Sequence, residues 1–483
     1  MIFLANIKSG VVVSTFGVFL SAFFWLLGFK VVAYWLGPEG VGLFSQLRQI
    51  AQAATIGATF GGTNSVVQGL SERKDQNARL AFRATVSRIV GGAGILLALT
   101  MLIATSAITR FFLSSTAPDL VATLRWMALA ALLSIGATYA IAVLNGYRSY
   151  GYMAVAQIAG SGAMAGLLVV LWLLQIPPNP QLLAGAFVLC FGLTYAIGAI
   201  GVLRLPALAS FASAQKLDSD QTRTFIHFAL SNLVAALSAT CSLLIIRTLV
   251  IEEHGLAFAG LFDAGWTLTF NYTTLFLTAC SVIYLPLLTA ATNNTSQKVC
   301  MLKTAYLVLG ASLLICNLMV LNRAFLINLL YSPQFQDSGR VLMVLVIAVV
   351  FRGVSWVYGT MIIATRNSRV LLISDVAQNV LLLAAAWYAL DRHASLEALS
   401  WVFVLSNFFY LVFVVEYARF KNPLLKRRLI WPFLIIGTLP LFYLALGAEW
   451  ANQTYPDIAK WVCVTVGTMV AITALFAGKK IKL

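Results

Sequence analysis

The sequence predicts an all-α polytopic membrane protein with about fourteen transmembrane helices. Of its 483 residues, 60% are hydrophobic and only 10% are charged, whereas soluble domains carry roughly 25% charged residues. Apolar stretches of about 20 residues, the length that crosses a bilayer as a helix, recur from one end of the chain to the other. No stretch is long and polar enough to form a separate soluble domain.

Fourteen apolar spans with short connections account for this pattern. They cover residues 11–36, 40–70, 88–113, 119–146, 151–174, 182–203, 225–250, 256–290, 304–330, 338–364, 370–390, 398–418, 429–447 and 459–477. The first span is longer than the core of a signal peptide and has no small-residue cleavage pattern behind it. We therefore expect the mature protein to keep it.

The distribution of basic residues sets the expected orientation. With the N-terminus in the cytoplasm, 21 of the 32 Lys and Arg residues fall in cytoplasmic loops and termini, six fall on the outer side and five lie within spans. Positive charge gathers in the cytoplasmic loops of membrane proteins. The asymmetry predicts that both termini are cytoplasmic. It also explains the net charge of +16 without nucleic acid as a partner.

Two short patterns recur in the two halves of the chain. Arg148 is followed nine residues later by Gln157 in VAQ, and Arg369 is followed nine residues later by Gln378 in VAQ. Each pair opens an expected span after a cytoplasmic turn, and six spans separate the two copies. Because six is even, both copies have the same orientation in the membrane.

A second repeat is in register with the first. The pentapeptide GVGLF at 40–44 is matched by FAGLF at 258–262, and Lys30 precedes the first by about as much as Arg247 precedes the second. These repeats predict two six-helix lobes in a parallel pseudo-repeat, an arrangement that transporters use.

The expected domains follow from the repeat. Residues 1–210 form the N-terminal six-helix lobe, residues 211–420 form the C-terminal six-helix lobe, and residues 421–483 form two additional transmembrane helices.

Charged residues inside spans are the main functional signal. An ionised side chain at the centre of a membrane helix costs about 2.5–3.5 kcal/mol on insertion scales. Arg88 is near a cytoplasmic span end, where a long side chain reaches the headgroups. Lys30, Arg48, Arg247 and Arg352 lie in four other spans, and Arg352 is near the middle of its span. Snorkelling remains an alternative for Lys30 and Arg48 and a stronger one for Arg247, whereas it is weakest for Arg352.

The intramembrane charges do not balance. Only Asp263 and Asp375 are candidate acids within the spans. A cavity with surplus positive charge favours an anionic ligand, and the donors of Arg suit phosphate. Asn271 and Gln378 are candidate polar residues of the cavity lining, although ordinary hydrogen bonds between helices are an equal alternative.

The sequence gives no sign of a metal site, a cofactor or a catalytic group. The six cysteines show no CxxC spacing, and the three histidines are far apart. The Gly-rich stretches at 91–94 and 160–166 are more typical of close helix packing than of phosphate binding, because no strand precedes either.

Several segments resemble the Wzx-type flippases, especially the enterobacterial common antigen flippase. They are LGPEGVGLFSQLRQ at 36–49, AVLNGYRSYG at 142–151, SVIYLPLL at 281–288, LLYSPQFQ at 329–336 and the region 347–378. The resemblance covers roughly residues 10–420, and the order and spacing of the segments make it specific. The chain departs from the enterobacterial relative in having two further spans.

The resemblance implies a member of the multidrug/oligosaccharidyl-lipid/polysaccharide (MOP) exporter superfamily, which includes the MATE transporters. It implies two six-helix lobes around a central cavity that work by alternating access. Wzx members move undecaprenyl-diphosphate-linked oligosaccharide, such as O-antigen units of lipopolysaccharide, across the bacterial inner membrane. A polymerase and a chain-length regulator of the same pathway are expected partners of a monomeric chain. The substrate-binding residues implied here are Lys30, Arg48, Arg247 and Arg352 for the diphosphate, with Asp263, Asn271 and Gln378 for the sugar.

Two alternatives belong to other functional classes. An ion-coupled, MATE-like exporter of cationic drugs would need carboxylates in its cavity, and here cations outnumber acids. A polysaccharide polymerase or ligase would need a large outer loop and a catalytic constellation, and the outer loops expected here have about a dozen residues or fewer.

Overall fold

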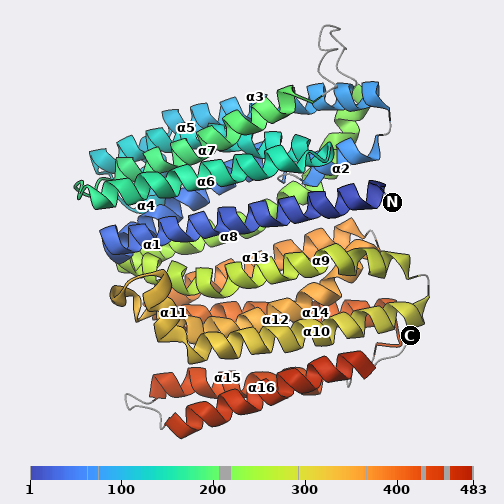
Figure 1. Cartoon of the computed structure of the whole chain (residues 1–483). Coiled ribbons are helices and arrows are strands. Elements are labelled where there is room, and N and C mark those ends of the chain that lie inside the picture. The colour runs from blue at the N-terminus through green and yellow to red at the C-terminus, as the bar shows by residue number, and fades with distance from the viewer. Residues whose placement is uncertain are drawn as a thin grey trace. The chain divides into compact units, whose positions relative to one another are not determined.

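The computed structural model describes residues 2–61, 64–73, 75–205, 219–291, 293–365, 367–425, 431–450 and 457–480 (Figure 1). These residues are nearly all helical, and no strand occurs among them. Ten of their helices are long and apolar enough to cross a membrane, and two shorter apolar helices, Trp431–Leu446 and Cys463–Gly478, follow. The chain is thus a multi-pass α-helical membrane protein.

The two longest helices each contain a kink at a glycine. Helix α1 (Ile2–Ala58) bends at Gly37, which has φ 65° and ψ −161°, and α8 (Ser219–Trp266) bends at Gly255, which has φ 84° and ψ 173°. Glycine adopts a positive φ without steric cost. Counting each kinked helix as two segments gives fourteen apolar segments in the described chain, the number that the sequence predicts.

The connection after the first span is very short. We expected a short outer turn at residues 37–40, and two helical segments meet there at Gly37, whose backbone angles are not helical. Pro38 follows the kink, where the first turn of the new segment needs no backbone N–H donor. The second segment ends at Ala58 rather than near residue 70, because Phe60 and Gly61 take positive φ angles and a separate helix follows.

The chain forms two compact units, Met1–Gly260 and Leu261–Leu483. Besides α1 and most of α8, the first contains α2 (Asn64–Glu72), α3 (Gln76–Ile103), α4 (Thr105–Leu113), α5 (Pro118–Gly146), α6 (Tyr150–Leu173) and α7 (Pro180–Leu203). The expected lobe boundary at 210/211 lies outside the described residues. The three predicted domains stay predictions.

The second unit contains the rest of α8 and the C-terminal helices. They are a π-helix (Thr267–Asn271), α9 (Tyr272–Ala290), α10 (Asn294–Leu321), α11 (Arg323–Leu330), a 3₁₀ turn (Pro333–Phe335), α12 (Ser338–Ala364), α13 (Ser368–Asp391), α14 (Leu396–Lys421), α15 (Trp431–Trp450) and α16 (Asp457–Lys480). The last two helices pack within this unit: the ring of Phe442 in α15 is 6.3 Å from that of Phe351 in α12.

Small residues set the closest helix contacts. A Cβ atom added at Gly160 in α6 would lie 2.0 Å from the hydroxyl oxygen of Thr194 and 2.4 Å from the carbonyl oxygen of Cys190, both in α7. Close helix packing is thus confirmed at Gly160, whereas a Cβ atom at Gly166 of the same stretch would meet nothing within 4 Å.

Candidate functional site

Helices α1 and α8 cross inside the first unit at two glycines. A Cβ atom added at Gly42 would lie 2.1 Å from the carbonyl oxygen of Leu256, and one added at Gly260 would lie 2.0 Å from the carbonyl oxygen of Pro38. Gly42 and Gly260 are the central glycines of GVGLF and FAGLF, and each follows its kink glycine by the same number of residues. The two repeats therefore meet in one nearly symmetric backbone contact.

Polar side chains also hold the segment of α1 after Gly37 against the segment of α8 before Gly255. The amide nitrogen of Gln46 donates to the hydroxyl of Thr248 at 3.0 Å, and that of Gln49 donates to the carbonyl of Thr240 at 3.2 Å. Arg247 is only 2% exposed, and its guanidinium donates to the carbonyl of Ser45 at 3.4 Å. The structure thus places Arg247 within the packing between these two helices.

The two cations of α1, Lys30 and Arg48, are less buried than Arg247. Lys30 and Arg48 are partly exposed. The guanidinium of Arg48 lies 4.8 Å from the ring centroid of Phe29, and the ammonium of Lys30 lies 5.8 Å from that of Tyr34. Both distances are in the range of cation–π contacts, which stabilise a cation without neutralising it. Lys30 makes no ion pair with a described residue and so keeps its charge for a further ligand.

The second unit holds Arg352 in a similar way. Arg352 lies in α12, about 18–21 Å from either helix end at the usual rise of a helix. Its guanidinium is 5.2 Å from the ring centroid of Phe270, and this ring also stacks on that of Trp266, 4.1 Å away and nearly parallel. Phe270 belongs to the π-helix, a local distortion frequent at functional sites.

The three polar residues assigned to sugar contacts have different environments. Asp263 is fully buried, Asn271 is exposed and Gln378 is partly exposed. The amide of Asn271 is 3.4 Å from the hydroxyl of Thr267 in the same π-helix. Asp375, the other intramembrane acid, accepts a hydrogen bond of 2.9 Å from the hydroxyl of Tyr410.

The sequence-predicted residues thus divide between the two units. Lys30, Arg48 and Arg247 belong to the first unit, while Arg352 and the predicted sugar contacts belong to the second. Sequence reasoning missed the aromatic residues that hold the cations. For Lys30 and Tyr34 the helical spacing of four residues was a usable signal, whereas nothing in the sequence joins Arg352 to Phe270.

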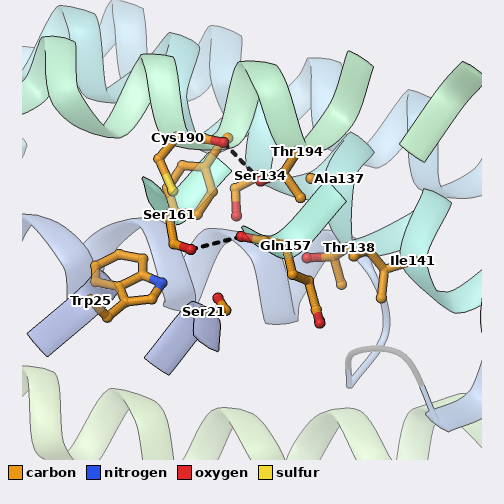
Figure 2. A pocket seen from close by; sticks show the side chains of 11 residues that line it. Ser21, Trp25, Ser134, Ala137, Thr138, Ile141, Gln157, Ser161, Cys190 and Thr194 are labelled. Carbon is orange, nitrogen blue, oxygen red and sulfur yellow. Dashed lines mark hydrogen bonds between the residues drawn. The ribbon is translucent and has the colours of Figure 1, made fainter. Parts of the chain in front are cut away.

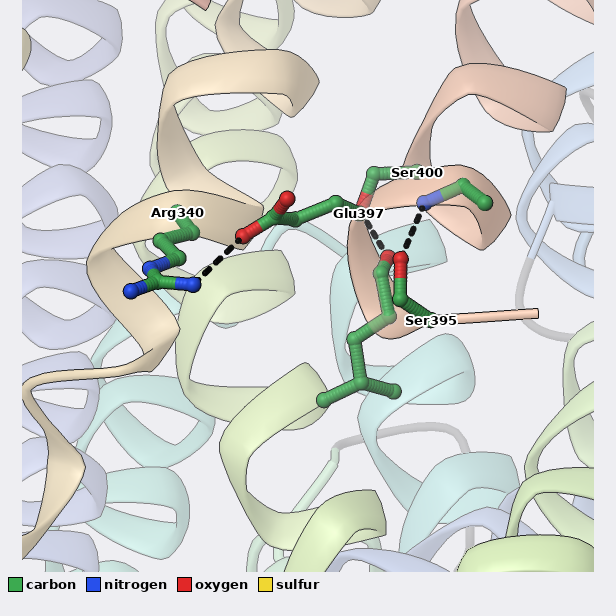
Figure 3. A network of polar contacts seen from close by, with 6 residues as sticks. Arg340, Ser395, Glu397 and Ser400 are labelled. Atoms are coloured by element: carbon green, nitrogen blue, oxygen red, sulfur yellow. Dashed lines mark hydrogen bonds and ion pairs between the residues drawn. The ribbon is translucent and has the colours of Figure 1, made fainter. Parts of the chain in front are cut away.

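An ion pair at the end of α12 shows the contrasting arrangement. Arg340 pairs with Glu397 of α14 at 3.5 Å, and the arginine side chain is 61% exposed (Figure 3). Ser395 caps α14 beside this pair by accepting from the backbone N–H of Ala398. A surface cation here has a carboxylate partner, whereas Lys30 and Arg352 make no ion pair with any described residue.

The sequence of the chain is similar to that of a lipid III flippase found in two bacteria. No protein-family model matches the chain. The chain is 23% identical over 391 residues to the lipid III flippase of Escherichia coli (strain K12). The aligned region covers 77% of this chain and 89% of that protein. The lipid III flippase of Shigella flexneri matches to the same extent. The chain is thus homologous to a lipid III flippase.

Solved structures confirm the fold. The lipid II flippase MurJ in an inward closed conformation matches with a TM-score of 0.68 at 9% identity, covering 98% of this chain and 100% of that chain. An inward-facing MATE family transporter of the MOP superfamily matches with a TM-score of 0.67 at 15% identity, covering 84% of this chain and 94% of that chain. The fold is therefore that of the MATE transporters and MurJ.

Proposed function

We propose that this protein is a flippase that moves undecaprenyl-diphosphate-linked oligosaccharide units across the bacterial inner membrane by alternating access. The sequence relative is named a lipid III flippase, and MurJ, which shares the fold, is named a lipid II flippase. O-antigen or a related surface polysaccharide unit is the proposed cargo. The relatives are named flippases and transporters rather than enzymes, which supports transport over polymerisation or ligation.

The observation that carries this proposal is the state of Lys30 and Arg352. Both lie in apolar helices, both stack on aromatic rings, and neither forms an ion pair within the described part of the chain. A charge kept in a membrane helix at a cost of about 2.5–3.5 kcal/mol without a carboxylate partner favours an anionic ligand. A diphosphate supplies that anion.

The chemistry of the cations fits a diphosphate. Arg48 and Arg352 offer planar sets of donors that can bind phosphate oxygens in pairs, while Lys30 offers a point charge. Arg247 completes the proposed set, and Asp263, Asn271 and Gln378 are the proposed sugar contacts. The polyprenyl tail would stay in the lipid.

The glycine kinks offer a place for movement. Gly37 and Gly255 interrupt α1 and α8 close to the cations of each helix. A hinge needs a few residues that absorb a change of backbone angles. We place the bending that opens each side of the membrane in turn at these two glycines, with both chain termini in the cytoplasm. A polymerase and a chain-length regulator are the proposed partners of the monomer.

An exporter of cationic drugs is the alternative that the shared MATE fold favours. Such an exporter would bind its cargo through carboxylates, but Asp263 is fully buried and Asp375 already accepts a hydrogen bond from Tyr410. Three partly exposed cations, Lys30, Arg48 and Arg352, outnumber the partly exposed acid Asp375. The charge of the candidate site thus argues against a cationic cargo.

Transport in proteoliposomes tests the proposal. The purified chain is reconstituted with fluorescent undecaprenyl diphosphate bearing one sugar, and the fraction that crosses the bilayer is measured by chemical quenching of the outer leaflet. We expect crossing that depends on the protein and falls at least about tenfold in Lys30→Gln and Arg352→Gln, because each removes a charge contact worth about 1.5–3 kcal/mol.

The matched control is Arg392→Gln. Arg392 also stacks on an aromatic ring, that of Tyr388, but lies exposed at the end of α13. Its variant should transport normally. Uptake of a cationic dye driven by a sodium or proton gradient, with no crossing of the lipid, would overturn the proposal in favour of the drug exporter.

A further inference from the structure

A polar pocket lies inside the first unit, between α1, α5, α6 and α7 (Figure 2). Its volume is about 270 Å³ and none of its lining residues is charged. Six lining residues carry hydroxyl or amide groups: Ser21, Ser134, Thr138, Gln157, Ser161 and Thr194. All four helices are long and apolar enough to cross a membrane. A polar group without a hydrogen-bond partner in such surroundings costs about 1–3 kcal/mol. A polar ligand that forms hydrogen bonds with these groups would remove that cost.

Three hydroxyl groups of the pocket already make one hydrogen bond within the protein, and each can still form another with a ligand. Ser161 and Thr194 donate to the carbonyls of Gln157 and Cys190 in their own helices, each at 2.8 Å (Figure 2). Their oxygens can therefore still accept a hydrogen bond. The hydroxyl of Thr55 donates its one hydrogen to the carbonyl of Ala51 at 2.8 Å, so Ser134, 2.9 Å away, donates to Thr55. The oxygen of Ser134 can therefore also accept a hydrogen bond from a ligand.

Gln157 has a buried hydrogen-bond acceptor that a ligand in the pocket could satisfy. Its side-chain oxygen is buried and has no hydrogen-bond partner among the described residues. Ser21 and Thr138 likewise make no side-chain hydrogen bond to another described residue. The pocket therefore presents both donors and acceptors. Gln157 is also the repeat counterpart of Gln378, a residue already proposed to contact sugar.

The shape and charge of the pocket narrow the class of ligand. An ion would lose its hydration without meeting an opposite charge, which is costly in a low-dielectric site. The volume is just below the range of about 300–1,000 Å³ that holds a drug-sized molecule, which fits one ring better than a whole oligosaccharide. Trp25 and Phe191 add aromatic surface to the lining. A sugar ring matches this mixture, with hydroxyls around its rim and C–H groups on its faces.

We infer that this pocket binds one neutral sugar residue of the lipid-linked oligosaccharide. The inference rests on the proposed flippase function and adds a subsite in the first unit. The hydroxyls of the sugar ring, or an N-acetyl group on it, bind to Gln157, Thr138 and Ser134. Trp25 packs against the face of the ring. The sugar subsite is thereby separate from the cations proposed to bind the diphosphate.

Binding of two lipids to the full-length protein in nanodiscs tests the inference. The probes are undecaprenyl diphosphate and undecaprenyl diphosphate bearing a single N-acetylglucosamine. We expect the wild-type protein to bind the sugar-bearing lipid more tightly. Gln157→Leu and Thr138→Val should weaken binding of the sugar-bearing lipid about threefold to tenfold, the effect of one hydrogen bond, and leave the affinity for undecaprenyl diphosphate unchanged.

Thr123→Val is the matched control. Thr123 is a buried threonine of the same helix whose hydroxyl bonds its own helix, at Asp119, and it does not line the pocket. Thr138→Val is nearly isosteric, so a folding defect is not expected, and its thermal melting is measured alongside. Unchanged discrimination in both pocket variants, or no discrimination by the wild type, would overturn the inference and mean that the pocket holds water. Failure of the wild type to bind either lipid would instead count against the flippase function.

Discussion

Helices α1 and α8 share one backbone arrangement but carry their charges differently. Each bends at a glycine of positive φ and then crosses the other helix at a second glycine. Before the bend, α1 carries Lys30, which is partly exposed, and α8 carries Arg247, which is 2% exposed. The structure thus repeats the backbone more faithfully than the environment of its cations.

The difference also holds after the bend. Arg48 in α1 stands at the repeat position of Trp266 in α8. Arg48 lies over Phe29, whereas Trp266 stacks on Phe270, the ring that also holds Arg352. An aromatic stack therefore supports a cation in both halves, but the cation comes from α1 itself in the first and from α12 in the second. The repeat predicts neither which residue provides the aromatic support nor which helix supplies the charge, because Phe29 corresponds to Arg247 and Phe270 to Gln52.

The largest expected effect breaks the shared backbone contact. A methyl group at Gly260 would lie 2.0 Å from the carbonyl oxygen of Pro38, a distance that only separation of the helices can relieve. We expect Gly260→Ala to lose most of the folded protein in detergent, measured by size-exclusion chromatography. Gly91→Ala is the control, because a Cβ at Gly91 meets nothing within 4 Å, and it should be neutral or stabilising by about 0.5–1 kcal/mol. Equal behaviour of the two variants would contradict the crossing.

A second prediction separates the buried arginine from the exposed one. Arg247→Gln should lower the free energy of unfolding by about 1–3 kcal/mol, since it disturbs a buried polar contact. Arg48→Gln should leave the melting temperature nearly unchanged and weaken binding of undecaprenyl diphosphate at least about tenfold. Thermal melting and lipid binding are measured for both. An unchanged melting temperature in Arg247→Gln would mean that Arg247 contributes no more to stability than Arg48 does, and the contrast would fail.

The aromatic support can be tested at Tyr34. Removing the ring beside Lys30 takes away a cation–π contact worth about 0.5–1 kcal/mol at a partly exposed site. Tyr34→Leu should thus weaken binding of undecaprenyl diphosphate about twofold to fivefold, measured by titration in nanodiscs. Tyr388→Leu, which removes the ring beside the exposed Arg392, is the control and should bind normally. Loss of binding in the control alone would exclude this role for Tyr34.

The smallest effect is expected at the ion pair between Arg340 and Glu397. Because the arginine is largely exposed, water screens the pair, and such pairs contribute about 0–1 kcal/mol. Glu397→Gln should shift thermal melting very little and leave transport unchanged. A stability loss as large as that of Arg247→Gln would show that a carboxylate partner matters as much as burial between helices.

Much of the candidate site could be predicted from the sequence, because a charged residue among apolar neighbours is recognised from the local sequence alone. The positions of Lys30, Arg48 and Arg352 stand out against their neighbours without any knowledge of packing. The polar pocket did not stand out. Ser161 and Thr194 come from different helices, and single hydroxyls in apolar helices are common enough to carry no signal until tertiary packing brings them together.

The sequence by itself determined the class of fold, the number of apolar segments and the residues at which charge enters the membrane. These follow from the hydrophobicity and length of each segment, which are properties of neighbouring residues. Only the tertiary structure decided that two helical segments meet directly at Gly37, that Arg247 is buried while Lys30 is not, and that Gln157 faces a polar pocket. Those outcomes depend on which faces of distant helices pack together, and helical periodicity in a membrane, where lipid and protein are equally apolar, does not specify that pairing.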